Sequence, residues 1–153
     1  MIFLSDAMKV VGIDTGSHTA IAVWDSEAGV LETLGTFHLW AALSFVSRLN
    51  GCADDMLVRF EDARQRTWVP WYQDETRNRG RAQGAGYVKA HCSIWAEFLQ
   101  DKGIRHEAVA PRRNVTKLDA EAFRRVTGWE GRTNEHERDA AMLVYGYGGR
   151  GKA

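Results

Sequence analysis

Residues 8–14 read Met-Lys-Val-Val-Gly-Ile-Asp, and this stretch decides the fold. Its apolar run has the length of a buried strand, and the turn residues at 15–17 end it. Residues 19–24 and 30–37 are two further strand-like runs, separated by a turn. Three consecutive strands joined by short turns predict an antiparallel meander at the start of the domain.

The rest of the chain alternates helical and strand-like segments. The pattern predicts helices over 39–49, 83–102, 116–126 and 134–145, and strands over 56–60 and 104–110. A capping-box pattern at Thr116–Asp119 and an N-cap at Asn134 mark the starts of the last two helices. Residues 62–82 read as a long, polar, arginine-rich loop. This order predicts an α/β domain with a mixed five-stranded sheet and helices on its faces.

The composition is that of one globular domain. With 153 residues, of which 44% are hydrophobic, the chain is long enough to bury a core and too apolar to be disordered. We expect an N-terminal extension over 1–7, the domain over 8–147 and a flexible tail over 148–153. No apolar run approaches the roughly 20 residues of a membrane helix. Two cysteines make no disulfide framework, and the N-terminus lacks a signal-peptide pattern, so we expect a cytoplasmic protein.

The formal net charge of zero conceals a gradient. Residues 1–61 hold three basic and eight acidic side chains, a net of −5, so the remainder carries +5. Nucleic-acid-binding proteins usually show a basic footprint, and here one half of the chain provides it. Neutrality therefore does not exclude a nucleic-acid partner.

Three carboxylates stand at the ends of apolar segments. Asp14 ends the first strand, Glu61 ends the fourth, and Asp139 precedes the apolar run of the last helix. Any one alone is more often a cap or a loop residue. If the first and fourth strands are neighbours, however, Asp14 and Glu61 emerge side by side, and a helix across that edge adds Asp139. Clustered carboxylates bind hard divalent cations, and a pair of such ions roughly 3.5–4 Å apart can support phosphodiester cleavage.

Two residues of the last helix accompany Asp139. His136 lies three positions before it, on the same helical face, and is a candidate fourth ligand or proton carrier. Its alternative is a surface histidine in the first helical turn. Glu135, four positions before Asp139, could take its place.

Together these motifs resemble the RuvC-like Holliday junction resolvases of the RNase H-like superfamily. The resemblance rests on Gly12-Ile-Asp-Thr-Gly16 after a strand, on Glu61, on His136-Glu-Arg-Asp-Ala140, on Pro111–Lys117 and on Thr127-Gly128. The order of elements fits from about residue 8 to 147. The resemblance implies an RNase H-like fold, with helices on both faces of the sheet.

It further implies an endonuclease that resolves four-way junctions or other branched DNA as a homodimer. Asp14, Glu61, His136 and Asp139 would bind Mg²⁺, as two ions and with Mn²⁺ able to substitute, while Lys117 would lie near the scissile phosphate. Many bacterial members carry aspartate where this chain has His136. The arginine-rich stretch after Glu61 is longer than in bacterial resolvases, and the compact chain would suit a bacteriophage version.

Basic and aromatic side chains follow Glu61. Guanidinium groups suit phosphates, and exposed aromatic rings stack on unpaired bases. The DNA-contact candidates are Arg64, Arg66, Trp68, Trp71, Arg77, Arg79, Arg81, Arg112 and Arg113. Trp68 and Trp71 could instead pack as a lid on the helix over 83–102. That helix has aromatic and aliphatic residues on more than one face, and the surplus, including Tyr87, His91 and Trp95, is available for a dimer contact or for core burial.

Other readings remain. Gly12–Ser17 also resembles the first phosphate loop of actin-like ATPases and sugar kinases, which need a second lobe that 153 residues do not supply. Another nuclease of the superfamily, acting on RNA–DNA hybrids or flaps, is the main rival. A non-catalytic nucleic-acid-binding module is disfavoured, because all three acids are present.

Overall fold

The computed structural model describes residues 8–66, 75–112 and 116–148. Along these residues the elements are β1 (Lys9–Asp14), β2 (His18–Asp25), β3 (Val30–His38), α1 (Leu39–Cys52), β4 (Met56–Glu61), the 3₁₀ helix η1 (Ala63–Gln65), α2 (Glu75–Asp101), β5 (His106–Val109), α3 (Ala120–Thr127) and α4 (Glu135–Met142). No helix in the described part of the chain has the length and apolar character needed to cross a membrane.

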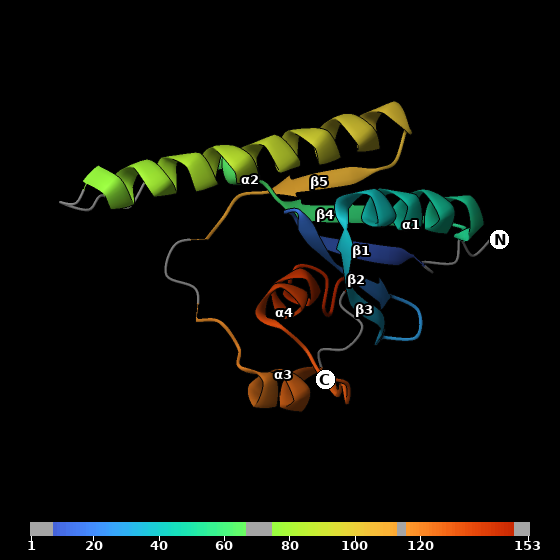
Figure 1. Cartoon of the computed structure of the whole chain (residues 1–153). Coiled ribbons are helices and arrows are strands. Elements are labelled where there is room, and N and C mark those ends of the chain that lie inside the picture. Colours follow the sequence, from blue (N-terminus) through green and yellow to red (C-terminus); the bar gives the residue numbers. More distant parts are fainter. Residues whose placement is uncertain (1–7, 67–74, 113–115, 149–153) are drawn as a thin grey trace.

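The strands form one mixed sheet in the order β3-β2-β1-β4-β5 (Figure 1). β1, β2 and β3 pair antiparallel, as predicted for the meander, whereas β4 and β5 join parallel to β1 and to each other. The carboxyl ends of β1, β4 and β5 therefore meet at one edge of the sheet. This is the mixed five-stranded α/β architecture that the RNase H-like resemblance implied.

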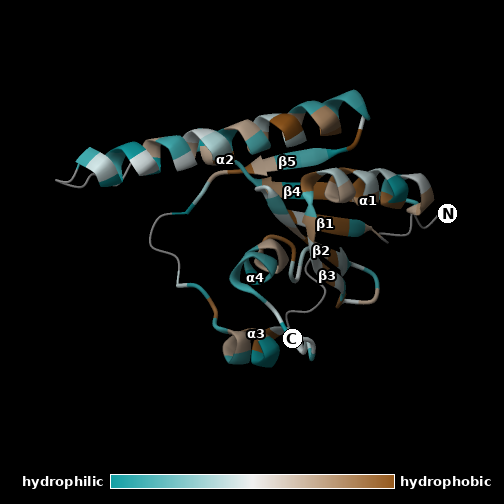
Figure 2. Ribbon diagram, viewed as in Figure 1, coloured by the Kyte–Doolittle hydropathy of each residue, from teal (hydrophilic) through white to brown (hydrophobic). Residues whose placement is uncertain are grey.

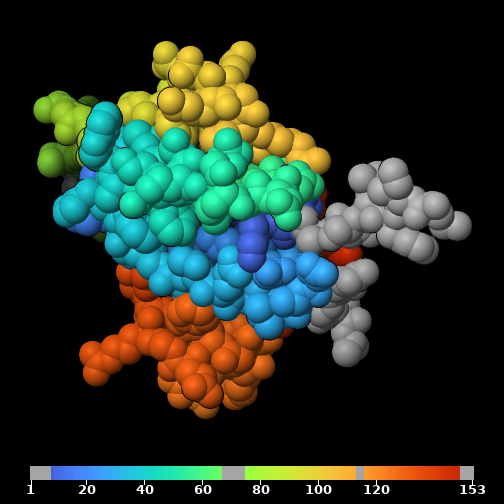
Figure 3. All heavy atoms as spheres, turned by 90° about the vertical axis from the view of Figure 1, so that its right-hand side faces the viewer, coloured from blue at the N-terminus to red at the C-terminus, as the bar shows by residue number. Residues whose placement is uncertain are grey.

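One face of the sheet packs on α1 and α2. Val11 and Ile13 of β1 point to this side, where Val46 of α1 and Trp95 and Leu99 of α2 are fully buried against them. Figure 3 shows α1 covering the sheet, with the C-terminal part of α2 above it and α3 below.

Two of the residues considered for a dimer contact belong to this core. His91 and Trp95 of α2 are buried within the chain itself. A side chain enclosed by its own domain is not available to a second copy, so core burial is the correct alternative for these two residues. Tyr87 is exposed on the same helix.

The opposite face packs on α3 and α4. Because side chains alternate along a strand, Val10 of β1 points to this side, where it meets Phe123 of α3 and Ala140 and Val144 of the C-terminal region. The strand β1 is thus buried on both faces, which explains its continuous apolar run. Helices on both faces of the sheet are confirmed.

The largest difference from the sequence expectation concerns residues 62–82. They were predicted as a loop, but α2 begins at Glu75, so Arg77, Arg79 and Arg81 belong to a helix. The glycines at 80, 84 and 86 do not interrupt this helix. A helical glycine costs only about 1 kcal/mol, and the surrounding Arg, Ala and Gln are good helix formers.

Smaller boundary differences have local causes. α1 runs through Gly51 to Cys52, and α3 begins only at Ala120 because the Asp119 side chain accepts the N–H of Ala122 as its N-cap. The capping box expected at Thr116 is therefore absent. Asn134 caps α4 as predicted, in a complete capping box with Glu137. β5 is shorter than the run over 104–110, and α4 ends at Met142 rather than at 145.

Candidate metal centre

Asp14 and Glu61 lie next to each other at the carboxyl edge of the sheet. β1 and β4 pair in parallel with Ile13 opposite Phe60, so the following residue of each strand is the carboxylate. Ile13 and Phe60 are both fully buried and fix this register. The adjacency expected from the sequence follows directly from the strand pairing.

Helix α4 brings Asp139 to the same edge by packing tightly on β1. A Cβ atom at Gly12 would overlap the backbone carbonyl of Ala140, so only glycine allows this approach. Ala140 and Ala141 are fully buried at the contact. The glycine of β1 and the alanine pair of α4 together place Asp139 beside the end of the strand.

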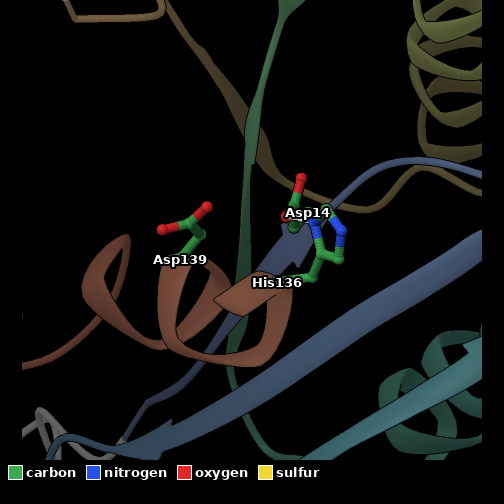
Figure 4. Close-up of side chains that lie close together, drawn as sticks. All are labelled: Asp14, His136 and Asp139. Atoms are coloured by element: carbon green, nitrogen blue, oxygen red, sulfur yellow. Dashed lines mark hydrogen bonds and ion pairs between the residues drawn. The ribbon is translucent and has the colours of Figure 1, made fainter. Parts of the chain in front are cut away.

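Three of the predicted ligands form a close cluster. Donor atoms of Asp14, His136 and Asp139 all lie within 4.8 Å of one another. Figure 4 shows the Asp14 carboxylate at the end of β1, with His136 and Asp139 on the first turns of α4. His136 Nδ1 lies 2.9 Å from Asp14 Oδ2, and the tautomer with a proton on Nδ1 donates this hydrogen bond.

Glu61 lies outside that close group but within its electrostatic reach. Its pKa is raised above the ordinary value, first by burial and then by repulsion from Asp14 and Asp139. The pKa of Asp14 is also raised by burial, against which the hydrogen bond from His136 acts. Burial and mutual repulsion destabilise the charged forms of these carboxylates, and a bound cation would stabilise them.

The donor set fits a divalent metal ion. Two carboxylates and an imidazole converge, and Glu61 offers a third carboxylate from the neighbouring strand end. Oxygen-rich sets of this kind suit Mg²⁺ and Mn²⁺, and the single imidazole is compatible with Mn²⁺.

Lys117 lies against this centre. Its ammonium group is 2.9 Å from Asp139 Oδ2 and 2.7 Å from Glu135 Oε1. Both contacts raise the pKa of Lys117. The hydrogen bond between Lys117 and Glu135 also lowers the pKa of Glu135. Glu135 thus faces Lys117 and lies outside the cluster of three candidate ligands. Of the two residues considered as a ligand beside Asp139, His136 and not Glu135 belongs to that cluster.

Replacing Lys117 by methionine is expected to raise the affinity for Mn²⁺ by about two- to fivefold, the range that an exposed ion pair is worth. The reason is that the ammonium group competes with the ion for Asp139. Calorimetric titration with Mn²⁺ measures the effect, and Lys102→Met, just after the C-terminal end of α2, is the control. Unchanged or weaker binding in Lys117→Met would contradict the competition.

The basic candidates divide into distinct positions. Arg64 is held by Asp62, with Nε and Nη2 at 2.8 and 2.9 Å from the two carboxylate oxygens. Arg66, Arg77 and Arg81 line one groove together with Glu61. Arg79 and Arg112 are exposed and do not line it, while Trp68, Trp71 and Arg113 lie outside the described residues.

Asp62→Asn is expected to lower the free energy of unfolding by about 1–2 kcal/mol, because the buried carboxylate accepts charged hydrogen bonds from Arg64. These contacts lower the pKa of Asp62. Its stabilising effect is therefore present above the ordinary pKa and disappears as the pH falls through the lowered one.

Urea denaturation at pH 7 and pH 3 measures this difference. The gap between wild type and Asp62→Asn should narrow at the lower pH. Asp55→Asn, which breaks the exposed pair with Arg105, is the control and should change little. A gap that is absent at pH 7 or widens in acid would refute the assignment.

Two residues that shape the site carried no role in the sequence expectation. Gly12 belongs to the quoted motif, and a glycine inside a buried apolar strand signals close approach of another backbone. Lys89 lines the groove beside Glu61 through its place on α2. The sequence does not distinguish it from the other basic residues of the chain, because its place in the groove depends on how α2 packs beside the end of β4.

The comparisons with known proteins add a distant structural likeness. No protein-family model and no curated protein matches the chain. One solved structure that is similar is the large terminase nuclease from thermophilic phage G20c, with 13% identity, a TM-score of 0.49, and coverage of 93% of this chain and 83% of that one.

Proposed function

We propose that this protein is a metal-dependent endonuclease that cuts branched DNA, with four-way junctions as its preferred substrate. The observation that carries the proposal is the cluster of Asp14, His136 and Asp139 at the carboxyl edge of the sheet, with Glu61 beside it. The resemblance to RuvC-like resolvases supports the choice of junctions. Its motifs coincide with these positions.

In this proposal Asp14, Glu61, His136 and Asp139 hold the Mg²⁺ ions. Bound there, the metal would activate water and stabilise the leaving oxygen in phosphodiester hydrolysis. His136, hydrogen-bonded to Asp14 and largely exposed, orients that carboxylate and can exchange a proton with solvent. Lys117 supplies a positive charge next to Asp139, where a phosphate oxygen of the substrate would approach.

A homodimer belongs to the same proposal. Two copies related by a two-fold axis would place two sites on two strands of a symmetric junction. Helix α2 supports this with exposed large apolar side chains at Tyr87 and Ile94. Sedimentation at micromolar concentration measures the mass.

The activity test compares a four-way junction, a flap, an RNA–DNA hybrid and a plain duplex, each end-labelled, with Mg²⁺, with Mn²⁺ and with EDTA. We expect metal-dependent cleavage of the junction above all others. Preferential cutting of the flap or the hybrid would contradict the junction as the preferred substrate and identify the flap or the hybrid instead. Absence of cleavage on every substrate, in protein that binds metal, would refute the nuclease proposal.

A further inference from the structure

A groove of about 610 Å³ adjoins the candidate metal centre at Glu61. Glu61 is part of its lining, and its walls also carry the cationic side chains of Arg66, Arg77, Arg81 and Lys89. The charge of Arg66 already acts on Glu61, whose pKa it lowers against the effects of burial and the other acids. The lining thus combines four cationic side chains with one carboxylate of the candidate metal centre.

The groove follows one face of helix α2. Arg77, Arg81 and Val88 line it at intervals of about one or two helical turns, with Gly84 between them. Arg79 lies on the other side of the helix and does not line the groove. Figure 1 shows this N-terminal half of α2 running past the sheet, and Figure 2 shows that it is mainly hydrophilic.

Bare backbone forms part of the groove wall at Gly80 and Gly84. A Cβ atom at either position would meet nothing within 4 Å, so the packing of the described residues does not require glycine there. Larger side chains would project into the groove and narrow it. Ala63, Ala85 and Val88 supply the apolar part of the lining.

The lining fits one class of ligand. Four cations in one groove suit a chain of phosphates, and the apolar part of the lining suits deoxyribose and exposed base faces. The acidic cluster beside the groove repels a polyanion, so cations in the groove are needed to hold one there. A paired strand keeps its base faces stacked away from such apolar patches, which favours an unpaired strand.

We infer that this groove binds a single strand of DNA and leads it to the metal centre, with Gly80 and Gly84 making room for its backbone. The inference rests on the proposed function for the identity of the polyanion. It assigns a specific role to one face of α2 and to Lys89. It also separates Arg77 and Arg81 from Arg79, which we expect to be dispensable for strand binding.

Gly84→Leu tests the inference, with Gly86→Leu as its matched control. Both changes place the same side chain in the same helix and favour helix formation, but Gly86 does not line the groove. Fluorescence anisotropy with a labelled 20-residue thymidine oligonucleotide in EDTA reports binding without cleavage. We expect the affinity to fall by about tenfold or more in Gly84→Leu and less than twofold in Gly86→Leu.

A charge pair gives a second readout. Arg81→Gln should reduce the slope of log affinity against log salt by about 0.7, the loss of one single-strand phosphate contact, whereas Arg79→Gln should leave it unchanged. Equal effects within either pair of variants, or no binding by the wild type, would overturn the inference. So would a loss confined to a duplex of the same length.

The two proposals fail in different ways. Cleavage of DNA by a Gly84→Leu variant that binds the oligonucleotide like the wild type would reject the groove and leave the nuclease standing. Selective loss of oligonucleotide binding in Gly84→Leu, with no cleavage of any substrate by the wild type, would reject the nuclease and support the groove.

Discussion

Asp14→Asn is expected to abolish metal-dependent cleavage, by about 1,000-fold or more, because the amide removes a central carboxylate and metal catalysis contributes several kcal/mol. Binding of Mn²⁺ should weaken in parallel. Binding of the labelled thymidine oligonucleotide in EDTA should remain within about twofold of the wild type, because Asp14 is not part of the groove lining. Gel assays, calorimetry and anisotropy measure the three quantities.

The same variant should fold at least as stably as the wild type without metal. Burial raises the pKa of Asp14 above its ordinary value. An acid of this kind favours the folded state in its protonated form, so its contribution is complete below the ordinary pKa and is lost as the pH rises through the raised one. The neutral amide of the variant does not ionise and so does not lose stability as the pH rises. We therefore expect an equal or higher melting temperature for Asp14→Asn at pH 7.

Asp54→Asn is the control for both effects, because Asp54 is exposed and precedes β4 at the opposite edge of the sheet from Glu61. It should cleave and bind metal like the wild type. Full cleavage by Asp14→Asn would refute the metal centre. A large drop in its metal-free melting temperature would instead make Asp14 a structural residue.

Gly12→Ala is expected to lower the free energy of unfolding by about 3 kcal/mol or more, because a methyl group there overlaps the carbonyl of Ala140 and neither strand nor helix backbone can yield easily. The helix α4 must then move away from β1, and Asp139 and His136 move with it. Affinity for Mn²⁺ should fall by at least about tenfold in protein that is still folded.

Gly35→Ala is the matched control, since it also adds one methyl group to a strand glycine. Its nearest neighbour is the edge of the Phe37 ring, 3.3 Å from the added carbon, and this side chain can shift. Urea denaturation and Mn²⁺ titration of both variants measure the difference. Equal stability of the two, or unchanged metal affinity in Gly12→Ala, would show that the close approach of α4 is not needed.

Much of the sheet is encoded in local patterns. The run over residues 8–14 is apolar at every buried position except Gly12, and it specifies a strand covered on both faces. The meander over β1–β3 follows from short turns. Once β4 is placed beside β1, the adjacency of Asp14 and Glu61 follows from strand geometry alone.

The start of α2 was not predictable in the same way. Its first half has few apolar residues, because it extends beyond the sheet and faces the groove and solvent. Helical periodicity detects burial on one side, so a helix with little buried surface looks like a loop. Arg77 and Arg81 lie on the face of α2 that lines the groove and Arg79 does not, and this distinction follows only once the helix is known to begin at Glu75.

The sequence by itself determined the order of the elements, the sheet with helices on both faces, and the three carboxylates at the ends of apolar segments. These features are local, because each depends on the spacing of residues along the chain. Only the tertiary structure decided which donors converge. The distance from Asp14 to His136 and Asp139 depends on how closely α4 packs on Gly12, and the pairing of Lys117 with Asp139 joins segments 22 residues apart. Such contacts are set by packing between elements, which no local pattern specifies.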